Sequence, residues 1–78
     1  MSTTSRITKE HLEMMEKRVN EHLKRYNIQV AYRYGYTALD LRTKNGILYD
    51  TLATGLTKRE AYTILYAIFT ILKLESTN

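Results

Sequence analysis

The sequence predicts an α+β domain with the element order α-β-β-β-α, in which two helices pack against a three-stranded antiparallel sheet. Apolar residues recur every three or four positions near both ends of the chain, as in helices, and alternate with polar residues in the middle, as in strands. The pair Asn45-Gly46 within the alternating part indicates a hairpin. The 78 residues form a single domain, 1–78, and we expect its polar ends, 1–6 and 75–78, to be flexible.

The first helix is predicted from about Lys9 to about Tyr26. Thr8 is a favourable N-cap residue, because its hydroxyl accepts an otherwise unpaired N–H of the first turn. Ile7 and Leu12 have the spacing of a hydrophobic staple. The apolar stripe of this helix, which predicts the face turned to the core, consists of Leu12, Met15, Val19, Leu23 and Tyr26.

The first strand is predicted over Ile28–Tyr36, where β-forming residues alternate with others and Gly35 marks a turn or a bulge. Tyr32, Tyr34 and Tyr36 would then share one face of this strand. Tyrosine combines a large ring with a polar tip, so it suits interfaces as well as cores. These rings therefore either close the core under the helices or form a binding surface.

The next two strands flank Asn45-Gly46. A two-residue type I′ turn needs positive φ at both central positions, and Asn-Gly adopts it at the lowest cost. This turn would pair Arg42 with Tyr49, which could form a cation–π contact on the outer face of the sheet. It would also pair Leu41 with Asp50, so that a carboxylate lies beside the apolar face unless the ladder ends there or Asp50 has a partner.

The second helix is predicted from about Lys58 to about Leu74, with Thr57 and Glu60 forming a capping box. Apolar residues cover nearly all its faces, and no charge lies between Glu60 and Lys73. A helix that is apolar all round is buried all round, which predicts a homo-oligomer, most simply a dimer. The residues assigned to the sheet are Ala61, Leu65, Ile68 and Leu72, and those assigned to the oligomer interface are Tyr62, Tyr66 and Phe69.

The chain lacks the residues of common catalytic and metal sites. Without Cys it has no disulfide framework, thiolate metal site or Cys nucleophile. His11 and His22 lie about 16 Å apart along the predicted helix, which is too far to share a metal ion. We expect both to be solvated or in a capping turn, and we expect no metal, no cofactor and no enzymatic activity.

The net charge of +4 comes from 12 Lys and Arg against 8 Asp and Glu. Glutamates interrupt the basic residues of the first helix, which favours a solvated mixed face there. Lys58 and Arg59 open the second helix, where cations oppose the helix dipole, so they could serve to hold a phosphate or a carboxylate. The candidate residues for binding a protein or an anionic ligand are Tyr32, Arg33, Tyr34, Tyr36, Arg42, Lys44, Tyr49, Lys58 and Arg59.

From Ile7 to Leu74 the chain resembles a diffuse set of small phage-encoded proteins of unassigned function. The matching pieces are ITKEHLE (7–13), YRYGYTALDL (32–41) and GLTKREAYTIL (55–65). The resemblance implies expression in the cytoplasm of an infected bacterium, and a host protein as partner, because small phage proteins often inhibit or sequester host components. It transfers no catalytic residue.

The element order, with Lys58 and Arg59 opening the last helix, is also similar to that of a double-stranded-RNA-binding domain. The chain differs from that family in its longer first helix, in lacking a Gly-Pro-x-His loop between strands, and in lacking an alanine-rich face on the last helix. This resemblance implies nucleic acid as the partner.

Two functions follow as expectations. The first is a non-enzymatic oligomeric protein that binds and modulates or inhibits a host macromolecule, through the Tyr-bearing sheet or the basic helix start. The alternative is a module that binds nucleic acid or an anionic nucleotide through its basic residues. The longest uncharged run, Ala61–Leu72, is shorter than the roughly 20 residues of a membrane span, and the first ten residues are polar. We therefore expect a cytoplasmic protein with no signal peptide and no role at a membrane.

Overall fold

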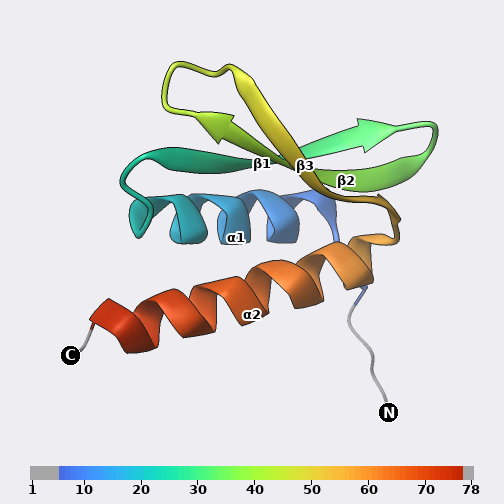
Figure 1. Ribbon diagram of the computed structural model, residues 1–78. Coiled ribbons are helices and arrows are strands. Elements are labelled where there is room, and N and C mark those ends of the chain that lie inside the picture. Colours follow the sequence, from blue (N-terminus) through green and yellow to red (C-terminus); the bar gives the residue numbers. More distant parts are fainter. Residues whose placement is uncertain (1–5, 77–78) are drawn as a thin grey trace, which may run out of the picture.

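The computed structural model describes residues 6–76 and contains two helices and three strands in the predicted order (Figure 1). The three strands form one antiparallel sheet in the order β1-β2-β3, and both helices lie on the same side of it. The predicted fold class is therefore confirmed. The elements are α1 (Lys9–Glu21), β1 (Tyr26–Arg33), β2 (Tyr36–Thr43), β3 (Leu48–Leu56) and α2 (Lys58–Ser76).

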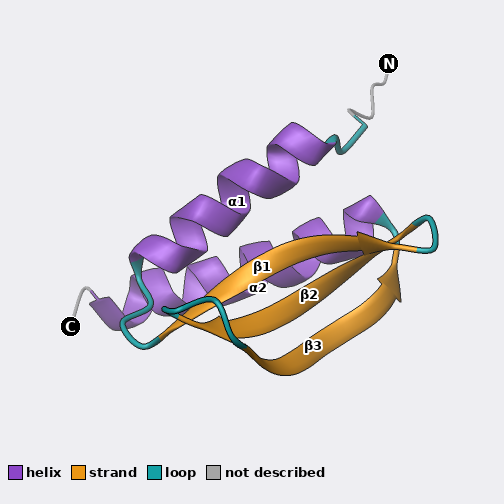
Figure 2. Ribbon diagram, turned by 90° about the horizontal axis from the view of Figure 1, so that it is seen from above, coloured by secondary structure: helices purple, strands orange, loops and turns teal. Residues whose placement is uncertain are grey.

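Seen from above, α1 lies along β1, and α2 runs beneath the sheet (Figure 2). The core lies where the two helices meet the sheet. Ile68 and Leu72 pack against it from α2, on the side that the sequence assigned to the sheet. The expected flexible positions 1–5 and 77–78 lie outside the described residues, whereas Glu75 and Ser76 belong to α2. The buried apolar residues of the core are Leu12, Met15, Val19, Ile28, Leu39, Ala61 and Leu65.

The predicted end of the first helix was wrong, because α1 ends at Glu21. The N–H of His22 donates to the carbonyl of Val19 over 3.0 Å and closes the last turn. Leu23 still packs against the core, but it does so from the loop after the helix, and Tyr26 already begins β1. Leu23 and Tyr26 therefore continue the apolar spacing of the helix in the sequence, although one lies in a loop and the other in a strand.

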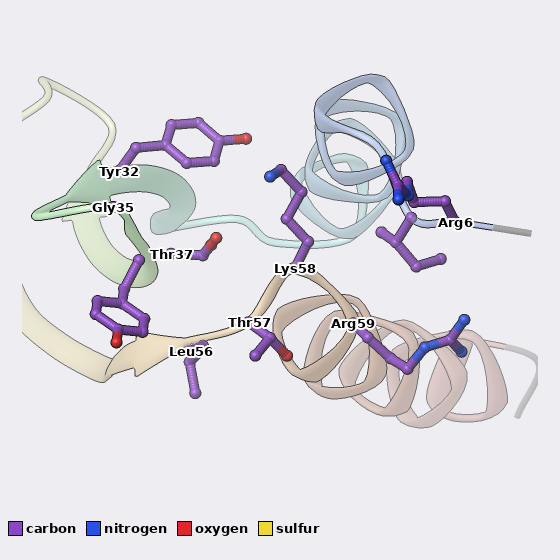
Figure 3. Close-up of a pocket in the computed structure, with 10 residues that line it drawn as sticks. Arg6, Tyr32, Gly35, Thr37, Leu56, Thr57, Lys58 and Arg59 are labelled. Carbon is purple, nitrogen blue, oxygen red and sulfur yellow. The ribbon is translucent and has the colours of Figure 1, made fainter.

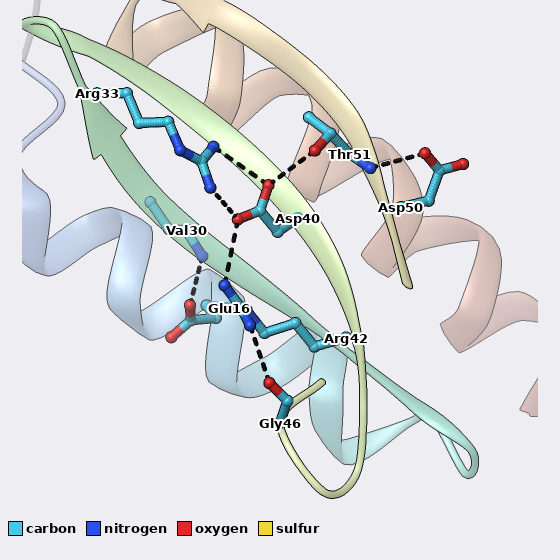
Figure 4. Close-up of polar contacts among 8 residues, drawn as sticks. All are labelled: Glu16, Val30, Arg33, Asp40, Arg42, Gly46, Asp50 and Thr51. Atoms are coloured by element: carbon cyan, nitrogen blue, oxygen red, sulfur yellow. Dashed lines mark hydrogen bonds and ion pairs between the residues drawn. The ribbon is translucent and has the colours of Figure 1, made fainter. Parts of the chain in front are cut away.

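Two polar side chains of α1 bind the outer edge of β1. The Asn20 amide accepts a hydrogen bond from the Ile28 N–H (2.7 Å) and donates one to the Ile28 carbonyl (3.0 Å). The Glu16 carboxylate accepts a hydrogen bond from the Val30 N–H over 2.6 Å (Figure 4). Unpaired backbone groups on an edge strand attract other strands, so these bonds close this edge of the sheet.

A two-residue turn with positive φ occurs at Tyr34-Gly35, so the predicted turn or bulge at Gly35 is a turn, but the strand predicted as far as Tyr36 ends before it. Arg33 pairs directly with Tyr36, and the φ angles of Tyr34 and Gly35 are 55° and 79°. This is the backbone pattern of a type I′ hairpin. The predicted first strand is therefore divided between β1 and β2, and the three tyrosines do not share a face of one strand.

The Asn45-Gly46 turn joins β2 to β3 as predicted, but its type is different. Gly46 has a φ of 88°. Among the described residues other than glycine, only Tyr34 has a positive φ, so Asn45 is not left-handed. The Gly46 N–H donates to the Thr43 carbonyl, and the Thr43 N–H donates to the Ile47 carbonyl, both over 2.9 Å. The turn thus contains one more residue than a type I′ turn and needs a single left-handed position, which the glycine supplies.

The strand β3 is longer than the part of β2 that it pairs with. Five residues of β2 between Thr37 and Arg42 pair with five of the 9 residues of β3, and the register shifts at three places. Leu41 pairs with Asp50 as predicted, but Arg42 pairs with Leu48 rather than with Tyr49. Bulges bend a strand and increase its twist, and in Figure 1 β3 accordingly runs diagonally across the sheet.

Candidate functional site

Both helices begin with the predicted Thr caps. At α1, the Thr8 hydroxyl accepts from the His11 N–H (3.3 Å), and the His11 ring nitrogen accepts from the Thr8 N–H (3.1 Å), which is the expected capping role of this histidine. At α2, the Glu60 N–H donates to the Thr57 hydroxyl (3.1 Å), and the Thr57 N–H donates to the Glu60 carboxylate (2.8 Å). Glu60 therefore already supplies a negative charge to the start of α2.

An open pocket of about 460 Å³ lies beside this helix start (Figure 3). It is lined by three parts of the chain: the residues before α1, the hairpin between β1 and β2, and the run from the end of β3 into the first turn of α2. None of the described lining residues is acidic, and three are basic. The lining residues that carry charge or a ring are Arg6, Tyr32, Tyr36, Lys58 and Arg59.

The hairpin with Tyr32 lies on one side of this pocket, and Arg6 and Arg59 lie on the other (Figure 3). In Figure 3 the Lys58 side chain extends into the space between Tyr32 and Arg6. The ammonium group of Lys9 lies 4.7 Å from the centre of the Tyr32 ring, which is a cation–π contact. Burial raises the pKa of the Tyr32 hydroxyl, and the charges of Glu13 and Glu16 raise it further, so this ring stays neutral at physiological pH.

Tyr34 occupies the tip of the hairpin next to the pocket, because its neighbours Gly35 and Tyr36 line the pocket wall. It is 98% exposed, and Tyr36 is 56% exposed. Together with the pocket they form the basic-aromatic end of the molecule, which we define as Arg6, Lys9, Tyr32, Tyr34, Tyr36, Lys58 and Arg59. Five of the nine binding residues predicted from the sequence belong to it.

A different set of predicted residues is tied into an ion-pair cluster on the face of the sheet opposite the helices (Figure 4). Arg33 binds both oxygens of the Asp40 carboxylate, at 3.2 and 2.5 Å, and Arg42 lies 3.7 Å from one of them. Thr51 donates to the same carboxylate over 3.3 Å. Asp40 has no exposed surface, and the hydrogen bonds from Arg33 hold its pKa below its ordinary value. The charges of these two arginines are thus partly neutralised within the chain.

The remaining predicted binding residues lie near the other end of β2. The Lys44 ammonium group donates to the Asn27 side chain over 2.8 Å. The Tyr49 ring packs against Tyr26, with 5.2 Å between the ring centres, and Arg42 donates instead to the Gly46 carbonyl over 2.8 Å. The expected cation–π pair of Arg42 and Tyr49 is therefore replaced by these contacts, because the bulge puts Leu48 opposite Arg42.

The residues assigned to an oligomer interface divide into two groups. Phe69 packs against the core, and its ring meets the His22 ring edge-on, with 5.7 Å between the centres. Tyr62 also packs against the core and stacks on Tyr66, whose own ring is 54% exposed. The side of α2 turned away from the core carries exposed apolar residues and two threonines. We call this set the α2 outer face: Thr63, Tyr66, Ala67, Thr70, Ile71 and Leu74.

Sequence reasoning missed Arg6 and Lys9 as members of the basic-aromatic end. Both lie close to Tyr32 or α2 only because the fold brings the start of α1 next to residues far along the chain. Within residues 6–76, no group of His, Asp and Glu side chains is arranged to hold a metal ion, and neither helix has the length and apolar character needed to cross a membrane.

No protein-family model matches the chain, and the comparisons with curated proteins and with solved structures found no match either.

Proposed function

We propose that this protein is a non-enzymatic interaction module that binds an anionic macromolecule at its basic-aromatic end. The observation that carries the proposal is the pocket at the start of α2, where Arg6, Lys58 and Arg59 come together with Tyr32 and Tyr36 and no described lining residue is acidic. Clustered cations attract phosphate or carboxylate groups over a distance, and aromatic rings add contact area at little entropic cost.

Among the residues predicted for binding, the cations of the sheet are engaged within the chain, which favours the start of α2 over the sheet. Arg33 and Arg42 share the Asp40 carboxylate, and Lys44 is engaged with Asn27. The backbone at the start of α2 adds little attraction for an anion, because the Glu60 carboxylate already lies there and accepts from the Thr57 N–H. The side chains therefore supply the attraction for an anion. The resemblance to small phage-encoded proteins supports a host macromolecule as the partner.

Binding to anionic polymers, measured by fluorescence polarisation at several salt concentrations, tests the proposal. Neutralising several phosphates makes the logarithm of the affinity fall linearly with the logarithm of the salt concentration. We expect Lys58→Glu with Arg59→Glu to remove binding, whereas the matched pair Lys17→Glu with Arg18→Glu, on the exposed side of α1, leaves most of it. No binding to duplex RNA, duplex DNA, single strands or polyglutamate at 50 mM salt would refute the proposal.

A second candidate function is association with another protein chain through the α2 outer face. The observation that favours it is the exposure of Ile71 (60%) and Leu74 (62%) beside Tyr66 on a helix with no charge between Glu60 and Lys73. Monomeric proteins rarely expose such a continuous apolar strip. A second copy of the chain is the partner we propose for this face.

A further inference from the structure

We propose that the anionic partner at the basic-aromatic end is a single-stranded nucleic acid, and that Tyr34 is a residue on which one of its bases stacks. This inference rests on the proposed function, and it adds the class of ligand and the role of a residue outside the pocket wall. It follows from the conformation of Tyr34, its exposure and the side chains around it.

The backbone of Tyr34 is held in a conformation that a tyrosine adopts at a cost. Its φ of 55° lies in the left-handed region, where a residue with a Cβ atom loses about 1–2 kcal/mol and where Asn or Gly is preferred. Strain of this kind is retained where a function requires it. A type I′ turn with Asn in this place would make the same hairpin more stable.

The fold gains almost no packing in return. With 98% of its surface exposed, the Tyr34 ring contacts very little of the chain, whereas Tyr32, two residues earlier, holds Lys9 over its face. Tyr34 lies at the tip of the hairpin and is almost completely exposed, so both faces of its ring are open to a flat partner. Nucleobases are flat partners, and each stacks on aromatic side chains whatever its sequence.

The cations lie where the backbone of such a strand would pass. Gly35, which follows Tyr34, lies on one side of the pocket, Arg6 lies on the other, and Lys58 lies between them (Figure 3). A strand with a base on Tyr34 would therefore direct its phosphates towards these two cations. The combination of a basic groove and stacking rings is typical of proteins that bind single strands without sequence preference.

A duplex makes less use of this arrangement. Its bases are paired and stacked on one another, so a protein reaches mainly the phosphates and groove edges, and an exposed aromatic ring at a hairpin tip gains little. An acidic peptide would satisfy the cations but offers no base to the ring. Unpaired bases with phosphates satisfy both features, and this difference decides the design of the test.

The test compares a single-stranded 12-nucleotide DNA or RNA with an abasic strand of the same length and charge. Tyr34→Asn removes the ring and relieves the strained backbone. We expect this variant to melt at a higher temperature than the wild type and to bind the single strand at least about 5-fold more weakly. Tyr34→Phe should keep the binding, because it keeps the ring. The control Tyr49→Asn removes another exposed ring, which is 64% exposed and lies near the opposite end of β2, and it should leave binding unchanged.

The outcomes separate this inference from the proposed function. Equal binding of the abasic strand and the normal strand, or a duplex bound more tightly than the single strand, would overturn base stacking while the anion-binding function stands. The same holds for unchanged binding by Tyr34→Asn or for preference for an acidic peptide. If the wild-type protein bound none of the anionic polymers, both this inference and the proposed function would be refuted. A lower melting temperature of Tyr34→Asn would show that the ring stabilises the fold, against the inference.

Discussion

At the scale of single residues, Asp40 decides how much positive charge the sheet offers to a partner. It lies on the central strand among residues that alternate with the core positions, so its carboxylate lies on the face away from the helices. The position is nevertheless fully covered, because Arg33, Arg42 and Thr51 surround it. One carboxylate thus holds two cations that sequence reasoning assigned to binding.

Removal of this carboxylate should destabilise the fold. Asp40→Asn keeps the shape but leaves Arg33 and Arg42 without their counter-charge, and we expect a loss of about 1–3 kcal/mol in the free energy of unfolding at pH 7. Because the folded pKa of Asp40 is lowered, its contribution is present above about pH 3.8 and is lost as the pH falls through the folded value. Urea unfolding at pH 7 and at pH 2.5 measures both effects. An equal loss at the two pH values would contradict the ionic role.

Glu16 should have the opposite pH dependence. Burial raises its pKa above 4.5 despite the hydrogen bond from the Val30 N–H, and Glu13 raises it further. The folded state therefore binds this proton more tightly, and the contribution of Glu16 to stability decreases as the pH rises from 4.5 through the folded pKa. Glu16→Gln still accepts from the Val30 N–H, so its stability at pH 7 should match or exceed that of the wild type.

The matched control for this prediction is Glu16→Ala, which leaves the Val30 N–H without its partner. It should cost about 1 kcal/mol at any pH. Thermal unfolding between pH 4 and pH 7 distinguishes the two variants. If Glu16→Gln were as unstable as Glu16→Ala, the negative charge itself would be needed at the edge of β1.

At the scale of elements, the sequence predicted the helix caps correctly and located both turns, but it did not predict features that depend on contacts between elements. The caps at Thr8 and Thr57 were predicted correctly, because a cap depends on three or four neighbouring residues. The end of α1 was missed, and the bonds that join Asn20 near this end to Ile28 could not be read from the sequence, because they form only when β1 lies beside the helix. The bulges of β3 have the same origin, because pairing with β2 sets them.

The type of the turn between β2 and β3 can be tested directly. Gly46 is left-handed and Asn45 is not. Gly46→Ala should therefore cost about 1–2 kcal/mol, whereas Asn45→Ala should change stability by no more than about 0.5 kcal/mol. A type I′ turn would instead make both substitutions costly, because it needs positive φ at both positions. Melting temperatures of the two variants distinguish the two turn types.

At the scale of the whole molecule, the thin shape explains why so much apolar surface remains outside. The chain measures 40 × 34 × 17 Å, and its radius of gyration of 13.0 Å exceeds the roughly 11.5 Å of a compact domain of this length. A two-layer fold of this size has few positions with neighbours on all sides, which leaves residues such as Tyr66 and Leu74 exposed. The sequence predicted excess apolar surface on α2. Which of its residues face outward depends on the fold, because the sheet and α1 cover the others.

We therefore expect the protein to form a dimer through the α2 outer face. Light scattering at micromolar concentration should give about twice the 9.2 kDa mass of one chain. Tyr66→Glu with Leu74→Glu should give a folded monomer, because both residues are exposed in the single chain. Phe69→Glu is a poor probe, since it disturbs the packing against His22. A wild-type mass of one chain would contradict the prediction.

The bulges of β3 also have a consequence for the behaviour of the protein at high concentration. The two edges of its sheet are closed by different means: side chains of α1 occupy the edge of β1, while the irregular register of β3 keeps its backbone groups out of the even spacing that another strand would match. We expect this irregularity to make the Leu- and Thr-rich segment 48–56 a poor template for fibril growth. Deleting one unpaired residue from this segment would remove one of the three register shifts, and we expect the more regular edge to aggregate more readily at high concentration.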